Sequence, residues 1–243
     1  MANHFSSQGF TRQLSLGVSL SDDATFDNFY ITPESNNAQV VDTLRRQAEN
    51  SGEEFVYIWG PAGIGLTHLL QAASHCADSH GLTVQYLPLR DLVGFAPEPL
   101  LEGFESLDLI CLDGLHQIVG RPGWEMALFN LFNRVRDSGK RMLMAATCGP
   151  KDLGVQLADL RSRLSSGLVL HLDSMNDSEK QAALQLRAAA RGLTLSNEVA
   201  QFILHRAPRN MNELFNFLER LDDASLAEQR KLTIPFVKRV LGL

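Results

Sequence analysis

The chain has 243 residues, of which 44% are hydrophobic and 21% are charged. That length suits one sizeable domain core with a smaller appended unit. The 22 basic and 28 acidic side chains give a net charge of −6, which argues against a protein that binds DNA, RNA or anionic lipid through a broad basic surface. No apolar run approaches the ~20 residues of a membrane span, and the N-terminus lacks the pattern of a signal peptide, so we expect a cytoplasmic protein without membrane contacts.

The three cysteines, Cys76, Cys111 and Cys148, are odd in number and widely spaced. This spacing disfavours a disulfide framework, and the histidines and acids show no metal-ligand pattern with the cysteines that would indicate a zinc site. We expect the cysteines to behave as small buried apolar side chains.

The first 24 residues are polar and show no sustained hydrophobic period, which predicts a flexible tail. Within them, leucines alternate after a glutamine in the segment Gln13-Leu14-Ser15-Leu16-Gly17-Val18. Taken alone, this alternation is more typical of an ordinary strand than of a binding motif.

A phosphate-binding loop is indicated after the first strongly apolar run, 55–59. The loop reads Gly60-Pro61-Ala62-Gly63-Ile64-Gly65-Leu66-Thr67-His68, and leucines and alanines at helical spacing follow it. Glycines in such a loop let backbone N–H groups converge on phosphate oxygens, and the next helix adds its dipole. Because Leu66 stands where a lysine normally neutralises the outer phosphates, we expect diphosphate binding to survive and hydrolysis to be lost. The alternative is an ordinary glycine-rich turn.

A second element ends in Asp113, after the buried-strand pattern 107–113. At the carboxyl edge of a parallel sheet this is the position of a Walker B aspartate, which holds Mg²⁺ in P-loop ATPases. Hydrolysing P-loop enzymes carry a second carboxylate next, whereas this chain has Gly114 and so lacks its own water-positioning acid at that place. Considered alone, Asp113 is more simply a turn aspartate before a glycine, and its pairing with the P-loop about fifty residues earlier favours the Mg²⁺ role.

Alternating strand and helix patterns predict an α/β fold, a P-loop module with a parallel five-stranded sheet flanked by helices on both faces. The expected strands are 54–59, 83–89, 107–113, 141–147 and 167–173, with a helix over 124–137.

From residue 176 the pattern becomes wholly helical and predicts a small C-terminal lid. The expected lid helices are 177–190, 196–207, 211–221 and 234–241. Ser174 or Asn176 is expected to cap the first of them and Ser196 the second. The chain is thus expected to divide into a tail (1–24), an α/β nucleotide-binding domain (25–175) and a helical lid domain (176–243).

Together, the P-loop, the strand ending in Asp113, Thr147 after the fourth strand and the helical lid resemble the AAA+ family, most closely its branch formed by the bacterial replication initiator DnaA. The similarity extends from Thr25-Phe26-Asp27-Asn28-Phe29 to about Leu221. It implies that Phe26 and Phe29 border an adenine pocket and that Thr147 occupies the sensor 1 position. Where the family places a sensor 2 arginine on the lid, this chain has Asn212, with Arg209 one turn earlier.

The stretch Ser162-Arg163-Leu164-Ser165-Ser166-Gly167-Leu168 resembles the initiator's box that contains its arginine finger. The resemblance implies that Arg163 acts in trans on a nucleotide bound to a partner. Without it, a surface ion pair of Arg163 or of the nearby Arg161 with Asp159 would be the simpler interpretation.

The tail segment 13–18 resembles the peptide by which many bacterial proteins bind the sliding clamp, the β subunit of DNA polymerase III. Such a peptide can place its glutamine and leucines into a preformed apolar groove. Gly17 and Val18 depart from the commoner Pro-Leu ending. The chain is too short for the initiator's C-terminal DNA-binding domain, so it looks like a shorter homologue of the initiator.

The resemblance implies a regulator of chromosome replication. Bound to the DNA-loaded clamp, the protein would stimulate hydrolysis of the ATP on DnaA by supplying Arg163 in trans, and so prevent re-initiation. Its own ligand would be ADP or another nucleoside diphosphate that is not hydrolysed, with Mg²⁺ held by Thr67 and Asp113. DNA would be reached only through the clamp.

Two other functions remain open from the sequence. One is a self-hydrolysing NTPase such as a helicase loader, which Leu66 and Gly114 oppose. The other is a DNA-binding initiator variant, which the scattering of basic pairs among acids opposes. A homodimer through Phe215, Phe217 and Leu218 is a further expectation, the simpler alternative being that these are core residues of the lid.

Overall fold

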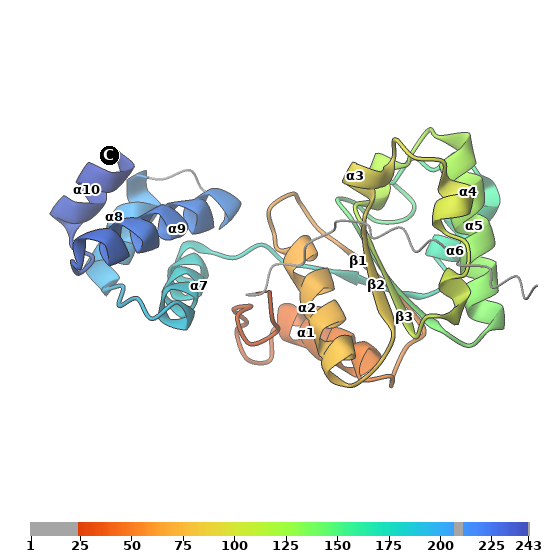
Figure 1. Cartoon of the computed structure of the whole chain (residues 1–243), viewed down its shortest axis with the longest axis horizontal. Helices are drawn as coiled ribbons and strands as arrows, with labels where there is room; N and C mark the ends of the chain where they lie inside the picture. The colour runs from red at the N-terminus through yellow and green to blue at the C-terminus, as the bar shows by residue number, and fades with distance from the viewer. Residues whose placement is uncertain (1–23, 207–210, 243) are drawn as a thin grey trace, which may run out of the picture.

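The computed structural model describes residues 24–206 and 211–242, with the side chain of Asn212 excepted. The tail segment 13–18 and Arg209 therefore lie outside the described residues. The chain forms an α/β unit that contains the sheet, followed by a helical unit at the C-terminus (Figure 1).

A five-stranded parallel sheet has the strand order β2-β3-β4-β1-β5, which confirms the expected fold class. The strands are slightly shorter than the sequence patterns predict, because the flanking residues lie in bends and loops and Leu89 already begins a helix. They are β1 (Phe55–Trp59), β2 (Val84–Pro88), β3 (Leu109–Asp113), β4 (Arg141–Ala146) and β5 (Leu168–His171).

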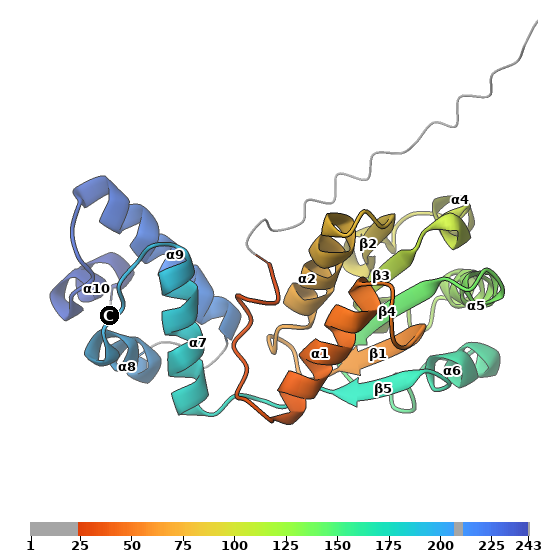
Figure 2. The same cartoon turned by 90° about the horizontal axis from the view of Figure 1, so that it is seen from below.

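Helices cover both faces of the sheet (Figure 2). Alternate side chains of each strand point to opposite faces, so Val56 and Ile58 pack on one side and Tyr57 on the other. The first face carries α1 (Asn36–Ala48) and α2 (Leu66–Ser79). The second carries α3 (Leu89–Leu92), α4 (Pro97–Leu100), α5 (Pro122–Asp137) and α6 (Ala158–Leu164), with short 3-10 turns at Phe104–Ser106 and Leu115–Gln117.

Helix α1 is an element that the sequence-based expectations do not include. Its signals are nevertheless present, since the Ser35 side chain accepts a hydrogen bond from the Ala38 N–H at 3.1 Å and buried residues recur at helical spacing. Gln47, which is buried, donates from Nε2 to the carbonyls of Glu53, Glu54 and Met142 at 3.2 Å. These bonds attach the end of α1 to the start of the sheet.

Four helices pack around their own apolar core to form the C-terminal unit. They are α7 (Asp177–Ala190), α8 (Asn197–Arg206), α9 (Met211–Glu228) and α10 (Ile234–Leu241). Asn176 and Glu179 form a capping box on α7, and the Ser196 hydroxyl accepts from the Val199 N–H at 3.3 Å. Helix α9 extends beyond the expected end at residue 221.

The apolar residues that suggested a dimer surface belong to this core instead. Leu218 is 1% exposed, and Phe215 and Phe217 are half-buried against the same cluster. This packing fits the simpler alternative of core residues, and the homodimer itself stays a prediction.

The connection between β5 and α7 is held by the first residues of α1. Asn36 Nδ2 donates to the His171 carbonyl at 2.7 Å, and Asn37 exchanges two hydrogen bonds with the Asp173 backbone at 2.9 and 2.8 Å. Thr32 donates to Glu179 at 2.7 Å, which joins the segment before α1 to the first turn of α7.

The cysteines are all reduced, and burial raises the pKa of Cys111 to about 12. Cys111 is fully buried, as expected, whereas Cys76 and Cys148 are half-buried. Among residues 24–206 and 211–242, no group of three metal-ligating side chains occurs, and no helix has the length and apolar character to cross a bilayer.

Asp108 ties the start of β3 to its neighbours, and its removal is expected to destabilise the protein in a pH-dependent way. Its carboxylate accepts from Lys140 Nζ at 2.8 Å and from the Thr83 N–H and hydroxyl at 2.9 and 2.7 Å. The Lys140 bond, followed by the Thr83 bonds, lowers the Asp108 pKa to about 2. Because this pKa is depressed in the folded state, the stabilisation is present above pH ~4 and is lost as the pH falls toward 2.

Asp108→Asn is therefore expected to lower the free energy of unfolding at pH 7 by about 1–2 kcal/mol, a figure reduced for partial solvent exposure. Urea unfolding at pH 7 and at steps between pH 4 and 2 measures this, with Asp223→Asn on the exposed face of α9 as control. A loss that does not change over that range would contradict the assignment to the charged carboxylate.

Candidate functional site

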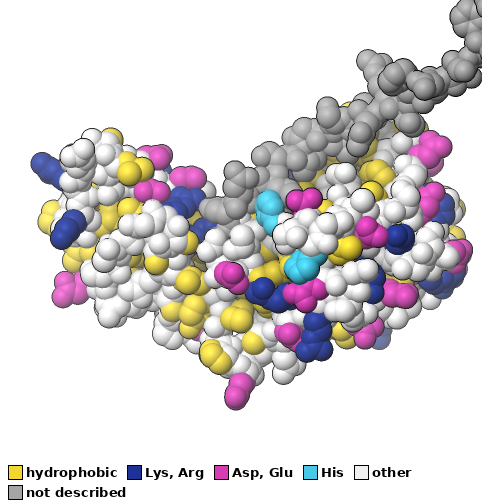
Figure 3. Space-filling view, turned by 60° about the horizontal axis from the view of Figure 1, so that its bottom comes forward, with side chains coloured by type: hydrophobic (Ala, Val, Ile, Leu, Met, Phe, Trp, Pro, Cys, Tyr) yellow, Lys and Arg dark blue, Asp and Glu magenta, His cyan; other side chains and the backbone are white. Residues whose placement is uncertain are grey.

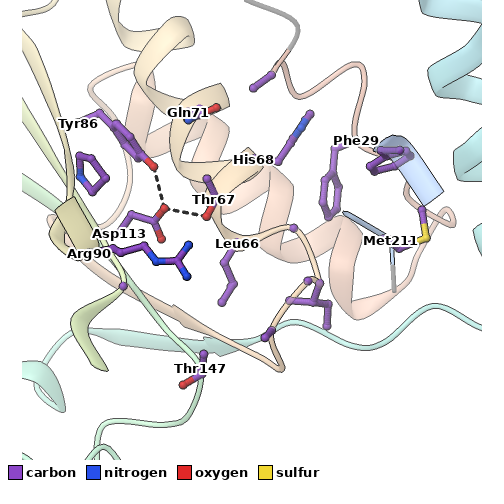
Figure 4. A pocket seen from close by; sticks show the side chains of 18 of the residues that line it. Phe29, Leu66, Thr67, His68, Gln71, Tyr86, Arg90, Asp113, Thr147 and Met211 are labelled. Carbon is purple, nitrogen blue, oxygen red and sulfur yellow. Dashed lines mark hydrogen bonds between the residues drawn. The ribbon is translucent and has the colours of Figure 1, made fainter. Parts of the chain in front are cut away.

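A cavity of about 590 Å³ lies at the carboxyl edge of the sheet, between the loop before α2 and the helices α7 and α9 (Figure 4). This volume is typical of a small-molecule site. Among the residues expected to bind nucleotide, those lining it are Phe29, Ala62, Gly63, Ile64, Gly65, Leu66, Thr67, His68, Asp113 and Thr147. Gly60, Pro61 and Phe26 are not among its lining residues.

The loop has the backbone that its glycines predict. Gly63 and Gly65 have φ of +81° and +106°, in the left-handed region that favours glycine. A Cβ on Gly65 would lie 2.6 Å from Cε2 of Phe29, so no larger residue fits there. Helix α2 begins immediately after Gly65, and the N–H groups of its first turn have no carbonyl partner within the helix. This arrangement suits an anionic oxygen held by backbone amides.

Leu66 lies at the position of the P-loop lysine and contributes no charge. It is half-buried, it lines the cavity, and it packs against the core between the sheet and α2. The loop therefore lacks the lysine charge that normally neutralises the outer phosphates, and compensating charge must come from a bound cation or from another element.

Asp113 is held by two hydroxyl groups from different elements. Thr67 Oγ1 and the Tyr86 hydroxyl both donate to its Oδ2, each at 2.7 Å (Figure 4). Burial raises the pKa of Tyr86, and the adjacent Asp113 carboxylate raises it further, so the phenol stays protonated and donates. Oδ1 accepts no hydrogen bond from the residues that the structure describes.

These residues fit the requirements of Mg²⁺. The ion usually takes one or two protein oxygens and completes its octahedron with phosphate and water. Thr67 and the Oδ1 atom of Asp113 could supply those protein oxygens beside a bound phosphate.

The position after Asp113 is closed to a second acid by its backbone. Gly114 has φ of +83°, and its N–H donates to the Ala145 carbonyl at 3.1 Å, which fixes this conformation. A glutamate there would be strained even though space for a Cβ exists. The backbone conformation at the end of β3 thus disfavours a water-positioning carboxylate at position 114.

Aromatic rings form the other end of the cavity. The rings of Phe29 and His68 lie 5.6 Å apart, and His68 Nε2 is 2.8 Å from the Thr25 carbonyl oxygen. Phe26 packs elsewhere, in the core beside α1, with the guanidinium of Arg45 over its ring at 5.1 Å. It supports the segment that carries Phe29 and does not face the cavity.

Several lining residues were not among the sequence-based candidates. Tyr86 lies within β2 and Arg90 just after the carboxyl end of that strand, an edge that the parallel sheet could have indicated. The C-terminal unit contributes Ala183 and Arg187 from α7 and Met211 and Phe215 from α9, with the Arg187 guanidinium 5.5 Å from the centre of the Phe215 ring. No sequence motif marks these lid residues.

Arg163 lies in the last turn of α6 and does not line the chain's own cavity. It is half-buried, whereas Arg161 is exposed. Within the described part of the chain, neither arginine forms an ion pair with Asp159 or with another acid, so the simpler surface-pair interpretation is not observed. A shallow hollow beside them is lined by Lys151, Ala158, Arg161, Ser162 and Ser165.

Glu125 fixes the start of α6. Its side chain, on α5, accepts from the N–H groups of Gln156 and Leu157 at 3.0 and 2.8 Å through Oε2, and from Gly120 at 3.0 Å through Oε1. The residue is 2% exposed, so this buried carboxylate is satisfied entirely by backbone donors. The orientation of α6, and with it of Arg163, depends on this contact.

Comparison with known proteins gives consistent matches over both units. Residues 20–171 match the family of the bacterial DnaA ATPase domain, and residues 177–241 match the lid domain of Hda. An uncharacterised protein of Haemophilus influenzae is 44% identical over 233 residues, which cover 96% of this chain and 99% of that protein.

Two solved structures are similar over most of the chain. Domain III of the Thermotoga maritima replication initiation protein DnaA is 25% identical with a TM-score of 0.78, over 93% of this chain and 98% of that one. AMPPCP-bound DnaA from Aquifex aeolicus is 25% identical with a TM-score of 0.70, over 82% of this chain and 65% of that one.

Replacing the buried Glu125 by glutamine is expected to lower the free energy of unfolding by about 2–3 kcal/mol. The amide keeps one acceptor oxygen but turns an NH₂ group toward a backbone N–H, so at least one buried donor loses its partner. Thermal and urea unfolding measure the loss. Glu98→Gln, at an exposed position of α4, is the matched control, and equal stability of the two variants would contradict the role of Glu125.

Proposed function

Since the chain belongs to the family of the bacterial DnaA ATPase domain and its C-terminal unit matches the Hda lid, we propose that it regulates replication initiation by acting on DnaA itself. In this proposal the protein stimulates hydrolysis of the ATP bound to DnaA and thereby limits re-initiation. The observation that carries it is the placement of Arg163, which lies on a helix whose start is held by Glu125, lies outside the chain's own cavity, and has no acidic partner among the described residues.

The proposed role of Arg163 is that of an arginine finger supplied in trans. Its guanidinium would lie against the charge that develops on the γ-phosphate of the partner's nucleotide, where such a group is worth ~10³ to 10⁵ in rate. The Glu125 contact supports this role because a finger must be held in one orientation to act.

The chain's own site is proposed to bind ADP or another nucleoside diphosphate without turning it over. The glycine backbone, the hydroxyl of Thr67 and the free oxygen of Asp113 support binding, with Mg²⁺ as a companion ion. Leu66 and Gly114 oppose the alternative of a self-hydrolysing NTPase, because the outer-phosphate lysine and the water-positioning acid are both absent from their usual places. The similar DnaA of Aquifex aeolicus holds AMPPCP.

Direct DNA binding is not supported by the surface charge. In the view of Figure 3, Lys and Arg side chains are interspersed with Asp and Glu and form no continuous basic face. Because the chain has a net charge of −6, we propose that it reaches DNA through the sliding clamp, to which residues 13–18 bind.

The first test is hydrolysis of DnaA-bound ATP in the presence of clamp loaded on DNA. The wild-type protein is expected to accelerate it, and Arg163→Ala is expected to reduce the acceleration by at least ~100-fold. Arg161→Ala, two residues away on the same helix, is the control and should keep the activity. Turnover by the isolated chain, or equal activity of Arg163→Ala and wild type, would contradict the proposal.

The clamp contact is tested separately. Leu14→Ala combined with Leu16→Ala should abolish retention on immobilised clamp, since the two leucines supply the apolar contacts of such a peptide. The control is Ser15→Ala, which keeps both leucines. Unchanged retention of the double variant would remove the tail from the mechanism without affecting Arg163.

A further inference from the structure

If the cavity holds a nucleoside diphosphate, as proposed above, its lining must supply positive charge to balance the phosphates. A diphosphate carries at least two negative charges, and backbone amides offer only partial positive charges to oppose them. Leu66 removes the lysine that normally completes the balance. Asp113 adds a negative charge to the same site, which would offset half of the charge of a companion Mg²⁺ ion.

Arg90 is placed to supply the missing charge. It lies in α3, immediately after β2, and lines the cavity together with Leu66 and Asp113. In Figure 4 its guanidinium points into the cavity, toward the side occupied by Leu66. The side chain therefore approaches from the sheet edge the region that a P-loop lysine would approach from α2.

The guanidinium of Arg90 is also uncommitted. It forms no hydrogen bond or ion pair with the residues that the structure describes, although Asp91 and Asp113 line the same cavity. The other arginine of the described lining, Arg187, lies on the lid over the ring of Phe215. Arg90 is thus the cation at the Asp113 end of the cavity.

We propose that Arg90 binds the β-phosphate of the nucleotide and replaces, from a different element, the charge that Leu66 omits. A guanidinium suits this task because it can donate two parallel hydrogen bonds to one phosphate group and stays charged at any physiological pH. The inference rests on the proposed nucleotide site and adds a phosphate-recognition residue outside the P-loop.

The test measures affinity by titration calorimetry with ADP and with AMP, and so does not depend on any catalytic activity. Arg90→Ala should weaken ADP binding by about 10- to 100-fold, the usual effect of losing a charge-assisted bond, while AMP, which lacks a β-phosphate, is weakened by less than about 2-fold. Adding Leu66→Lys to Arg90→Ala should restore most of the ADP affinity, because the lysine then supplies the charge from α2. Arg136→Ala, an exposed arginine on α5, is the control.

The outcomes separate this inference from the one on which it rests. If the wild type binds ADP and folded Arg90→Ala binds it equally well, the role of Arg90 is overturned and the nucleotide site stands. Equal weakening of ADP and AMP would also overturn it, because the effect would not then concern the β-phosphate. If the wild type binds neither ADP nor ATP, the nucleotide site itself is wrong and the inference falls with it, while the Arg163 test is unaffected.

Discussion

The parallel pairing of β1, β4 and β3 is the constraint from which the site follows. Their register places Trp59 beside Ala146 and Asp113 beside Ala145, so that the three strands end at the same edge. The register alone therefore brings together residues at the ends of these strands that are far apart in the sequence. The P-loop leaves from β1, Thr147 from β4 and Asp113 from β3, and the hydrogen bond from Thr67 to Asp113 is the direct result.

Backbone and core contacts hold the shape of the cavity, and the residues that a hydrolysing P-loop enzyme would carry at positions 66 and 114 are not part of them. Gly65 is fixed by the ring of Phe29, Gly114 by its bond to Ala145, and Asp113 by Tyr86, so the cavity is built mainly from backbone and core contacts. None of these contacts needs a lysine at position 66. The form of the cavity is therefore independent of a lysine at position 66, and the charge proposed for phosphate binding is supplied by Arg90 at its rim.

The sequence predicted the elements with strong periodic patterns and the glycine-rich phosphate-binding loop. The five strands, α5, α7 and the P-loop belong to this group, because buried strands and glycine spacing leave clear local signals. It did not anticipate Tyr86, Arg90 or Arg187, whose roles depend on which elements end beside one another. Phe26, in contrast, was expected to border the site but packs in the core beside α1. Glu125 has the sequence context of an ordinary helix glutamate, because its partners, the backbone N–H groups before α6, are about thirty residues away in the chain.

The contacts between α1 and the segment after β5 have a consequence for how the helical unit can move. Asn36 and Asn37 occupy the backbone polar groups of His171 and Asp173, where a hinge would need its torsion angles free. A swing of the lid must therefore break these bonds, or it must turn about the residues between Asp173 and α7 and break the bond from Thr32 to Glu179. Helix α1 and the segment before it therefore restrain the lid, and the bonds of Gln47 at the other end of α1 anchor that restraint to the start of the sheet.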